Sequence, residues 1–333
     1  MKKIISLLLV LAMVCLCGLG FAEGGPLIID SAYVDTSKLL VEAVDNPENK
    51  EVKIAALCVT YSPFWIEVVS GMETAKAYLA DKNCTVDLIA LEDLDAQMFY
   101  DAIQTCIIKD YDAITTFGVS NALIPAIQDA TDAGINVYIY NCNTEQANSA
   151  VCFVGQDLYT AGQRSGELLV EYMGEEGTVG IITGLFSANA HELRRTGAIS
   201  VLEQYEGIKL LESLECDDND ITAYDVATDL ITANPDISGI ICTANGQIGT
   251  ARAISDLGKQ DQITLIAFDY MTEVLDFIDS GVIKASIAQG PFTQGASPII
   301  YAYNDVVTGT HNVTGNSFTN LDLITVDNTA DYR

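Results

Sequence analysis

Short apolar runs alternate with amphipathic stretches from Glu51 onward, and this alternation restricts the chain to a small set of folds. The apolar runs have the length of buried strands, and the amphipathic stretches have the period of helices that cover a sheet. We expect strands at 52–59, 85–91, 112–117, 137–140, 151–154, 178–183, 208–214, 238–243, 263–267 and 283–288. Helices are expected between them, at 62–80, 96–109, 122–133, 158–173, 190–204, 221–233, 247–257, 271–279 and 293–307. This order predicts parallel sheets with helices on both faces.

Ten strands suit two sheets better than one, so we expect two doubly wound, Rossmann-like α/β lobes. Ligands of open parallel sheets bind outside the carboxyl ends of the strands. Two such sheets facing each other would form a cleft between these edges. The residues that follow each strand are therefore the candidates for a binding site.

The N-terminus has the three parts of an export signal. Lys2 and Lys3 give it a positive start, residues 4–19 are almost entirely apolar, and small residues precede the cleavage site expected after Ala22. The apolar run is too short for a stable membrane anchor. We therefore expect a cleaved signal peptide at 1–22 and an exported protein, in the periplasm or at the outer face of the cell membrane.

The charge of the chain limits its partners. Loss of the signal peptide removes two lysines and no acid, so 14 basic residues face 46 acidic ones and the formal net charge moves from −30 to −32. Such a surface repels phosphate backbones and anionic lipids, which argues against nucleic acid as a partner. Neutral ligands suit it best.

The cysteines predict neither a metal site nor a disulfide framework. Cys15 and Cys17 lie in the signal peptide, and neither follows the small residue that lipid attachment requires, so a lipid anchor is the weaker alternative. Seven cysteines remain, an odd number without CxxC spacing. We expect free thiols, with pairing of Cys142 and Cys152 as the alternative.

Several chemistries lack their motifs. Residues 23–333 contain neither of the glycine-rich loops that bind nucleotide phosphates. Two histidines, His191 and His311, make a metal cluster or a Ser-His-Asp triad hard to assemble. The acidic run 217–220 departs from the spacing of a calcium loop, so we interpret it as a polar turn and helix cap. No cofactor or metal is expected.

Polar and aromatic side chains follow most of the expected strands. Carboxylates accept hydrogen bonds, arginine donates them, and amides do both, while aromatic rings offer flat apolar surfaces. These groups complement the hydroxyls and the C–H face of a sugar, and two neighbouring rings could sandwich it. The candidate ligand-binding residues are Phe64, Trp65, Asn141, Arg194, Asn245, Asp269 and Gln289.

Each candidate also has a purely structural interpretation. Asp269 could cap the helix expected to begin near residue 271, and Asn141 and Asn245 could be turn residues. Phe64 and Trp65 could be core contacts of the first helix. Arg194 could be a solvated helix charge, and His191 is interpreted as a solvated histidine rather than a ligand contact.

The sequence resembles the type I periplasmic sugar-binding proteins, the ribose and galactose/glucose-binding group, from about residue 51 to residue 326. Each shared fragment is short, but their order and spacing together are specific. The fragments are Pro63-Phe64-Trp65 with Gly71-Met72, Gly134-Ile135, Gly155-Gln156-Asp157 with Gly162, Arg194 with Gly197, Ala244-Asn245, Phe268-Asp269, and Ile287-Ala288-Gln289 with Pro291.

The resemblance implies a non-catalytic solute-binding protein that closes on a monosaccharide or similar polyol and delivers it to the permease of an ABC importer. It implies an N-terminal lobe of 51–156 plus 290–317, a C-terminal lobe of 157–289 plus 318–333, and a three-strand hinge near 155–157, 289–291 and 317–319. Residues 23–50 form an N-terminal extension, and we expect a monomer.

The resemblance narrows the ligand only in part. Asn141-Cys142 stands where ribose binders have Asp-Arg, and galactose/glucose binders also carry Asn there, so ribose is disfavoured. One alternative function is a ligand carrier for a chemoreceptor or signalling system that binds a nucleoside or furanose signal. The other is an exported carbohydrate-processing enzyme, which would need a pair of carboxylates, with Asp157 as a candidate partner of Asp269.

Overall fold

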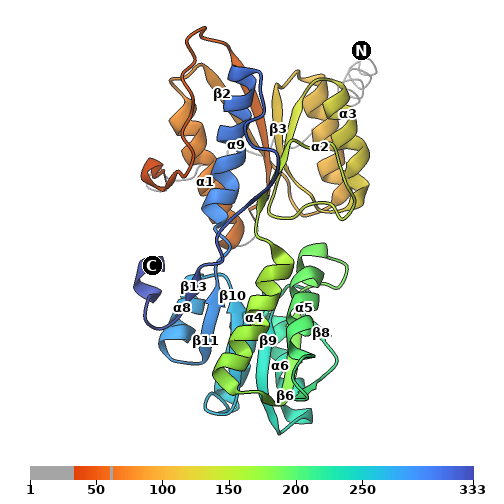
Figure 1. Ribbon diagram of the computed structural model, residues 1–333, viewed down its shortest axis with the longest axis vertical. Coiled ribbons are helices and arrows are strands. Elements are labelled where there is room, and N and C mark those ends of the chain that lie inside the picture. The colour runs from red at the N-terminus through yellow and green to blue at the C-terminus, as the bar shows by residue number, and fades with distance from the viewer. Residues whose placement is uncertain (1–33, 61–62) are drawn as a thin grey trace, which may run out of the picture.

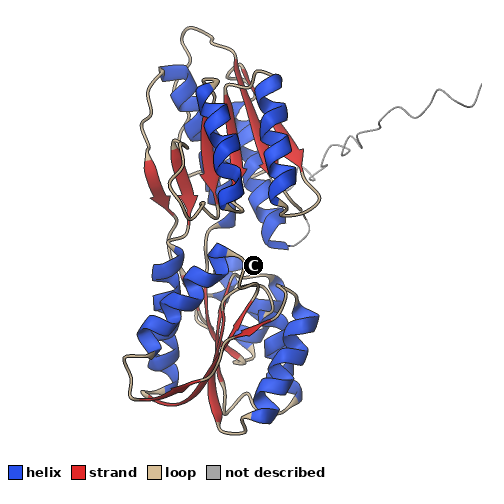
Figure 2. Ribbon diagram, turned by 90° about the vertical axis from the view of Figure 1, so that its right-hand side faces the viewer, coloured by secondary structure: helices blue, strands red, loops and turns tan. Residues whose placement is uncertain are grey.

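The computed structural model describes residues 34–60 and 63–333, and these form two α/β lobes stacked along the long axis of the molecule (Figure 1). The predicted signal peptide at 1–22 lies outside the described residues. Each lobe has one sheet of mainly parallel strands between layers of helices (Figure 2). The predicted fold class is therefore confirmed.

The N-terminal lobe is built on a six-stranded sheet in the order β12-β5-β4-β3-β1-β2, with every neighbouring pair parallel. Helices α1 and α9 pack together over it, and α2 packs with α3. The strands are β1 (Val52–Cys58), β2 (Cys84–Ala90), β3 (Ala113–Phe117), β4 (Asn136–Tyr140), β5 (Cys152–Gly155) and β12 (Gly315–Phe318). The helices are α1 (Pro63–Leu79), α2 (Ala96–Ile108), α3 (Ile124–Asp132) and α9 (Pro291–Thr308).

The C-terminal lobe has the sheet order β13-β11-β10-β9-β6-β7, with β8 also paired to β6 and only β13 antiparallel. Helix α4 packs with α5, and α7 lies between α6 and α8. The strands are β6 (Glu176–Thr183), β7 (Gly207–Leu210), β8 (Leu214–Glu215), β9 (Ile237–Cys242), β10 (Thr264–Phe268), β11 (Ile283–Ile287) and β13 (Leu323–Ile324). The helices are α4 (Leu158–Met173), α5 (Asn189–Leu202), α6 (Asp220–Ala233), α7 (Gln247–Asp256) and α8 (Thr272–Asp279).

The central strands are buried on both faces, which explains why they read as continuous apolar runs. All five residues of β3 and all five of β10 are buried. The expected strand at 208–214 is wrong, because the chain leaves β7 after Leu210 and pairs again with β6 only at β8. Strands β12 and β13 were not among the ten strands expected from the apolar runs, since 315–318 is polar and largely exposed. The resemblance alone implied a hinge strand near 317–319.

Within the residues that the structure describes, the chain crosses between the lobes three times: between β5 and α4, between β11 and α9, and between β12 and β13. Residues 34–50, in the predicted extension, lie against the N-terminal lobe. There the backbone N–H of Val44 donates to Oδ1 of Asn304 at 2.8 Å, and Nδ2 of Asn304 donates to the carbonyl of Glu42 at 3.0 Å. Among the described helices, none combines the length and apolar character needed to cross a bilayer.

Candidate functional site

A cavity of about 510 Å³ lies between the lobes at the carboxyl ends of the strands. The N-terminal lobe provides one wall, the C-terminal lobe provides the other, and the crossing after β11 lies beside both. All seven candidate residues line this cavity: Phe64, Trp65, Asn141, Arg194, Asn245, Asp269 and Gln289. Residues up to 225 positions apart in the chain thus share one space, as the strand-end argument predicts.

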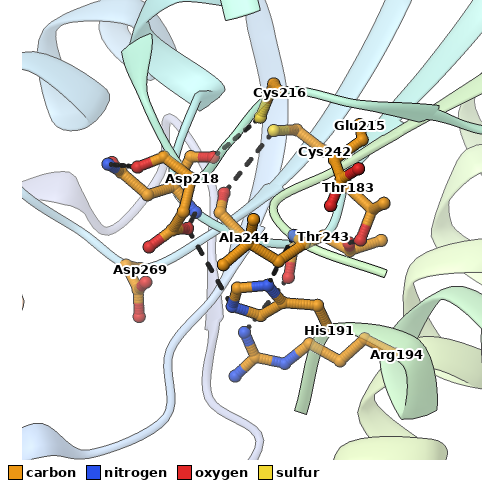
Figure 3. Close-up of polar contacts among 12 residues, drawn as sticks. Thr183, His191, Arg194, Glu215, Cys216, Asp218, Cys242, Thr243, Ala244 and Asp269 are labelled. Carbon is orange, nitrogen blue, oxygen red and sulfur yellow. Dashed lines mark hydrogen bonds and ion pairs between the residues drawn. The ribbon is translucent and has the colours of Figure 1, made fainter. Parts of the chain in front are cut away.

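Arg194 on α5 is the fixed cation of the site. Its guanidinium donates from Nε and Nη2 to Oε1 of Gln156 at 3.0 and 2.7 Å, and from Nη2 to Oε1 of Gln289 at 2.9 Å. Nη1 donates to the carbonyl of Thr243 at 3.2 Å (Figure 3), and the group lies 4.2 Å from the ring centre of Phe268. Its side chain is buried, so the interpretation as a solvated charge is wrong. Burial lowers the pKa of Arg194 to about 10, which leaves it charged at neutral pH.

Asp269 directly follows β10, with its backbone in the left-handed region at φ 68°. Its Oδ1 accepts from Nε2 of Gln289 at 2.7 Å. Helix α8 begins only at Thr272, with Met271 at its N-cap, so the interpretation of Asp269 as a helix cap is wrong. Burial raises the pKa of this carboxyl, and the nearby Arg194 opposes the rise. A non-glycine residue held at positive φ is uncommon and is often found at ligand sites.

Asn141 follows β4 and also has a left-handed backbone, with φ 64°. Asn141 is therefore a turn residue, and its side chain also lines the cavity. Its Nδ2 donates to Oε1 of Gln294 at 2.9 Å, and Nε2 of Gln294 donates to the carbonyl of Gln289 at 2.7 Å. This chain of bonds connects the strand end of one lobe to the crossing segment.

Among the described residues, the phenylalanine and tryptophan side chains that line the cavity, Phe64, Trp65 and Phe117, come from the N-terminal lobe. The rings of Phe64 and Trp65 meet edge to face with centres 5.0 Å apart, and Trp65 meets Phe117 in the same way at 5.4 Å. Phe64 and Trp65 therefore leave no room between them for a ligand ring, and the expected sandwich is wrong. Trp65 is only 5% exposed and also packs on Tyr140, so it is a core residue with one edge on the cavity. These rings form a single apolar wall.

The opposite wall is polar and includes residues that the sequence argument did not select. His191, Asp217 and Asp218 all line the cavity. His191 is not solvated, because most of its side chain is buried and its Nδ1 accepts from the backbone N–H of Leu185 at 3.0 Å. The turn-and-cap interpretation of 217–220 holds for Asn219, whose side chain caps α6. His191 lies after β6, and Asp217 and Asp218 lie after β8. These positions were the signal from which the sequence could have indicated them.

Asn245 follows β9 and is held by the loop that carries Asp218. The backbone N–H of Asn245 donates to Oδ1 of Asp218 at 3.0 Å, and Nδ2 donates to the Asp218 carbonyl at 2.7 Å. Burial raises the pKa of Asp218 to about 6, with Asp269 and Asp220 adding to the rise. The C-terminal wall is thus rich in acceptors.

A second space between the lobes, of about 790 Å³, adjoins the first and shares Phe64, Asp269 and Met271 with it. Both ends of the described chain border it, through Lys38 and Arg333. It is larger, but it lacks Arg194, Asn141 and Asn245, so the smaller cavity holds the convergent polar groups expected of a binding site.

Comparisons with known proteins agree with this architecture. Residues 56–310 match the family model described as "Periplasmic binding protein domain". The D-allose-binding periplasmic protein of Escherichia coli K12 is 28% identical over 248 residues, which cover 71% of this chain and 78% of that protein. A D-ribose/D-allose-binding protein of Pseudomonas aeruginosa is 24% identical, covering 74% and 78%.

Two solved structures illustrate the shared fold. A solute-binding protein from Burkholderia graminis in complex with D-arabinose superposes with a TM-score of 0.78 at 21% identity, covering 85% of this chain and 98% of that one. One from Actinobacillus succinogenes with bound D-allose gives a TM-score of 0.76 at 22% identity, covering 85% and 100%. The family match spans more than half of the sequence, and the chain belongs to the periplasmic binding protein family.

Proposed function

We propose that this protein is an exported solute-binding protein that captures a monosaccharide or a similar small polyol between its lobes and delivers it to the permease of an ABC importer. The observation that carries the proposal is the convergence of seven residues, from both lobes and the crossing between them, on one cavity. The related proteins named for D-allose, D-ribose and D-apiose binding support the ligand class.

The two walls suit the two kinds of surface on a sugar. The C–H face of the ring fits the aromatic wall formed by Phe64, Trp65 and Phe117, where burial excludes water. The hydroxyl groups face the opposite wall, where the carboxylates of Asp218 and Asp269 accept hydrogen bonds from them. Charge-assisted hydrogen bonds of this kind are about twice as strong as neutral ones.

The cavity favours binding over catalysis. Asp157, the possible catalytic partner of Asp269, caps α4 by accepting from the backbone N–H of Thr160 at 3.2 Å and is not among the cavity-lining residues. Asp269 itself is bonded to Gln289. We therefore propose reversible binding without turnover. The expectation that the protein is a monomer is part of the same proposal. The signalling alternative gains no support from the cavity.

Ligand bridging both walls would stabilise the closed arrangement, because only that arrangement makes both sets of contacts. We take the lobes to divide at the predicted boundaries, so the three crossings absorb the rotation. The permease would then receive the ligand from the closed protein. Export to the outer side of the membrane belongs to the same proposal.

The test is a ligand screen on the mature protein. Thermal unfolding is measured with D-allose, D-ribose, D-arabinose, D-glucose and D-galactose, and titration calorimetry follows for those that raise the melting temperature. At least one sugar should bind with a micromolar or lower Kd, and glutamate, a charged solute of similar size, should not. Binding of glutamate with no response to any sugar would contradict the proposal.

A further inference from the structure

His191 and Asp218 face each other at one corner of the cavity, with Nε2 of the histidine 3.9 Å from Oδ1 of the aspartate (Figure 3). This separation is too long for a direct hydrogen bond. Gly184 makes room for both, since a Cβ at that position would lie 2.6 Å from the imidazole and 2.9 Å from Oδ1 of Asp218. The two side chains therefore lie close together, but they form no direct hydrogen bond with each other.

The backbone fixes which nitrogen of His191 carries the proton. Nδ1 accepts from the N–H of Leu185, so the neutral imidazole has its hydrogen on Nε2, the atom that faces Asp218. Burial and the adjacent Arg194 lower the pKa of His191 to about 4. At neutral pH the ring is uncharged, and Nε2–H is a donor.

Asp218 supplies the matching acceptor. Its Oδ1 accepts from the N–H of Asn245, which fixes the orientation of the carboxylate. An ionised carboxylate offers further acceptor positions and no donor. A donor and an acceptor thus stand side by side at a spacing that one oxygen atom can bridge.

We propose that His191 and Asp218 clamp a single hydroxyl group of the ligand, with Nε2–H donating a hydrogen bond to the hydroxyl oxygen and the hydroxyl O–H donating one to the Asp218 carboxylate. This inference rests on the proposed function and identifies two specificity-determining residues. A hydroxyl satisfies both partners. A deoxy position satisfies neither, a carbonyl oxygen leaves the carboxylate unpaired, and an ammonium group leaves Nε2–H unpaired.

The test combines ligand analogues with substitutions. The sugar of the screen that binds most tightly is titrated calorimetrically, together with each of its monodeoxy analogues, against the wild type, Asp218→Asn and His191→Asn. Asn at 218 keeps an acceptor for Asn245 but removes the carboxylate, and Asn at 191 keeps an acceptor for Leu185 but removes the Nε2 donor. Glu203→Gln, on the exposed end of α5, is the charge control.

In the wild type and the control, one deoxy analogue should bind about ten- to a hundredfold more weakly than its parent sugar, the range expected for a hydrogen bond to a charged group. In both clamp variants the parent should lose a similar factor, and removal of that same hydroxyl should then cost less than about threefold, because contacting groups are not additive. Melting temperatures of the variants verify that they are folded.

The outcomes separate the two proposals. If the sugars bind but every deoxy analogue loses the same factor in the clamp variants as in the wild type, the clamp is wrong and the sugar-binding function stands. If no sugar binds the wild type, the proposed function fails and the clamp fails with it. If Asp218→Asn is unfolded, Asp218→Ser replaces it, and if His191→Asn is unfolded, His191→Gln replaces it. The titrations are then interpreted in the same way.

Discussion

At the scale of single residues, Asp269 offers the sharpest test of the cavity. Asp269→Asn keeps an oxygen to accept from Gln289 but removes the charge that faces Arg194. We expect the affinity for the sugar to fall at least tenfold, because charge-assisted hydrogen bonds contribute about 1.5–3 kcal/mol. The melting temperature should change by only a few degrees. Titration calorimetry and thermal unfolding measure the two effects, with the exposed Asp225→Asn as control; unchanged affinity would place Asp269 outside the binding site.

The pair His191 and Asp218 also predicts two opposite pH dependences of stability. The folded-state pKa of Asp218, about 6, lies above its ordinary value of 3.8, so its contribution to stability is present below pH 4 and is lost as the pH rises through 6. For His191 the folded pKa of about 4 lies below 6.5, so its contribution is present above pH 6.5 and is lost as the pH falls through 4. The charged groups acting on them are Asp269, Asp220, Arg194 and Glu192.

Substitution separates these contributions. The melting temperature of Asp218→Asn minus that of the wild type should rise between pH 4 and pH 7, because asparagine cannot acquire the buried charge. The same difference for His191→Asn should fall over that interval. At low pH the unfolded wild type binds a proton at His191 that the folded protein does not, and this destabilising effect disappears as the pH rises. Thermal unfolding of the ligand-free proteins at several pH values measures both. If both differences changed in the same direction between pH 4 and pH 7, the assignment of the two pKa shifts would be contradicted.

The candidate residues were accessible from the sequence because each lies in the turn or helix that follows a strand of a parallel sheet, and all seven line one cavity. The detailed geometry of these side chains could not be predicted from the sequence. Whether Phe64 and Trp65 enclose a ring or touch each other depends on side-chain packing within one lobe, which strand order does not determine. His191 was not selected because it was interpreted as a solvated histidine. Asp218 was not selected because aspartate beside a helix cap is also an ordinary turn residue.

At the scale of elements, two glycines bring α4 and α5 into contact beside the site. A Cβ on Gly162 would collide with the backbone of Arg194, and one on Gly197 would collide with the backbone carbonyl of Tyr159. The sequence fragments that contain Gly162, Arg194 and Gly197 are thus the two sides of one helix contact. Close approach of these helices positions the guanidinium over Phe268.

This contact predicts the effect of adding one methyl group. Gly162→Ala should destabilise the fold by about 1–3 kcal/mol through overpacking. It should also weaken sugar binding by displacing Arg194. Gly166→Ala, one turn further along α4, is the matched control, because its Cβ would stand 3.0 Å from its nearest neighbours and should have a smaller effect on both. Urea unfolding and calorimetry compare the variants, and equal losses of affinity would contradict the positioning role.

Elements with strong periodicity were predictable, and weakly patterned ones were not. Helix α4 has the predicted bounds, with Asp157 at its N-cap and Gly174 at its C-cap. Strand β12 has the sequence Gly-Asn-Ser-Phe and lies at a sheet edge, so neither burial nor alternation marks it. The break between β7 and β8 is likewise not marked in the sequence, because leucine residues lie on both sides of it and its position depends on which residues of β6 pair with the chain.

At the scale of the whole molecule, the asymmetry of the cavity bears on closure. The aromatic wall belongs to the N-terminal lobe, and the wall with Arg194, Asn245 and Asp269 belongs to the C-terminal lobe. A ligand can shift the lobes only by the difference between its affinities for the two arrangements. If the ligand first binds one wall in the open arrangement, the difference in affinity comes from the contacts that it makes with the other wall on closure. Loss of one wall should therefore reduce closure even when the other wall is still occupied.

We expect a saturating concentration of the tightest-binding sugar to decrease the radius of gyration of the wild type, measured by small-angle X-ray scattering. Phe64→Ala removes part of the aromatic wall and should bind about tenfold more weakly. At saturation it should remain less compact than the liganded wild type, because fewer contacts depend on closure. Tyr172→Ala removes an exposed aromatic side chain of α4 and should close normally. Full compaction of Phe64→Ala would mean that the C-terminal wall and the crossings alone drive the lobes together, and the aromatic wall would then act only in affinity.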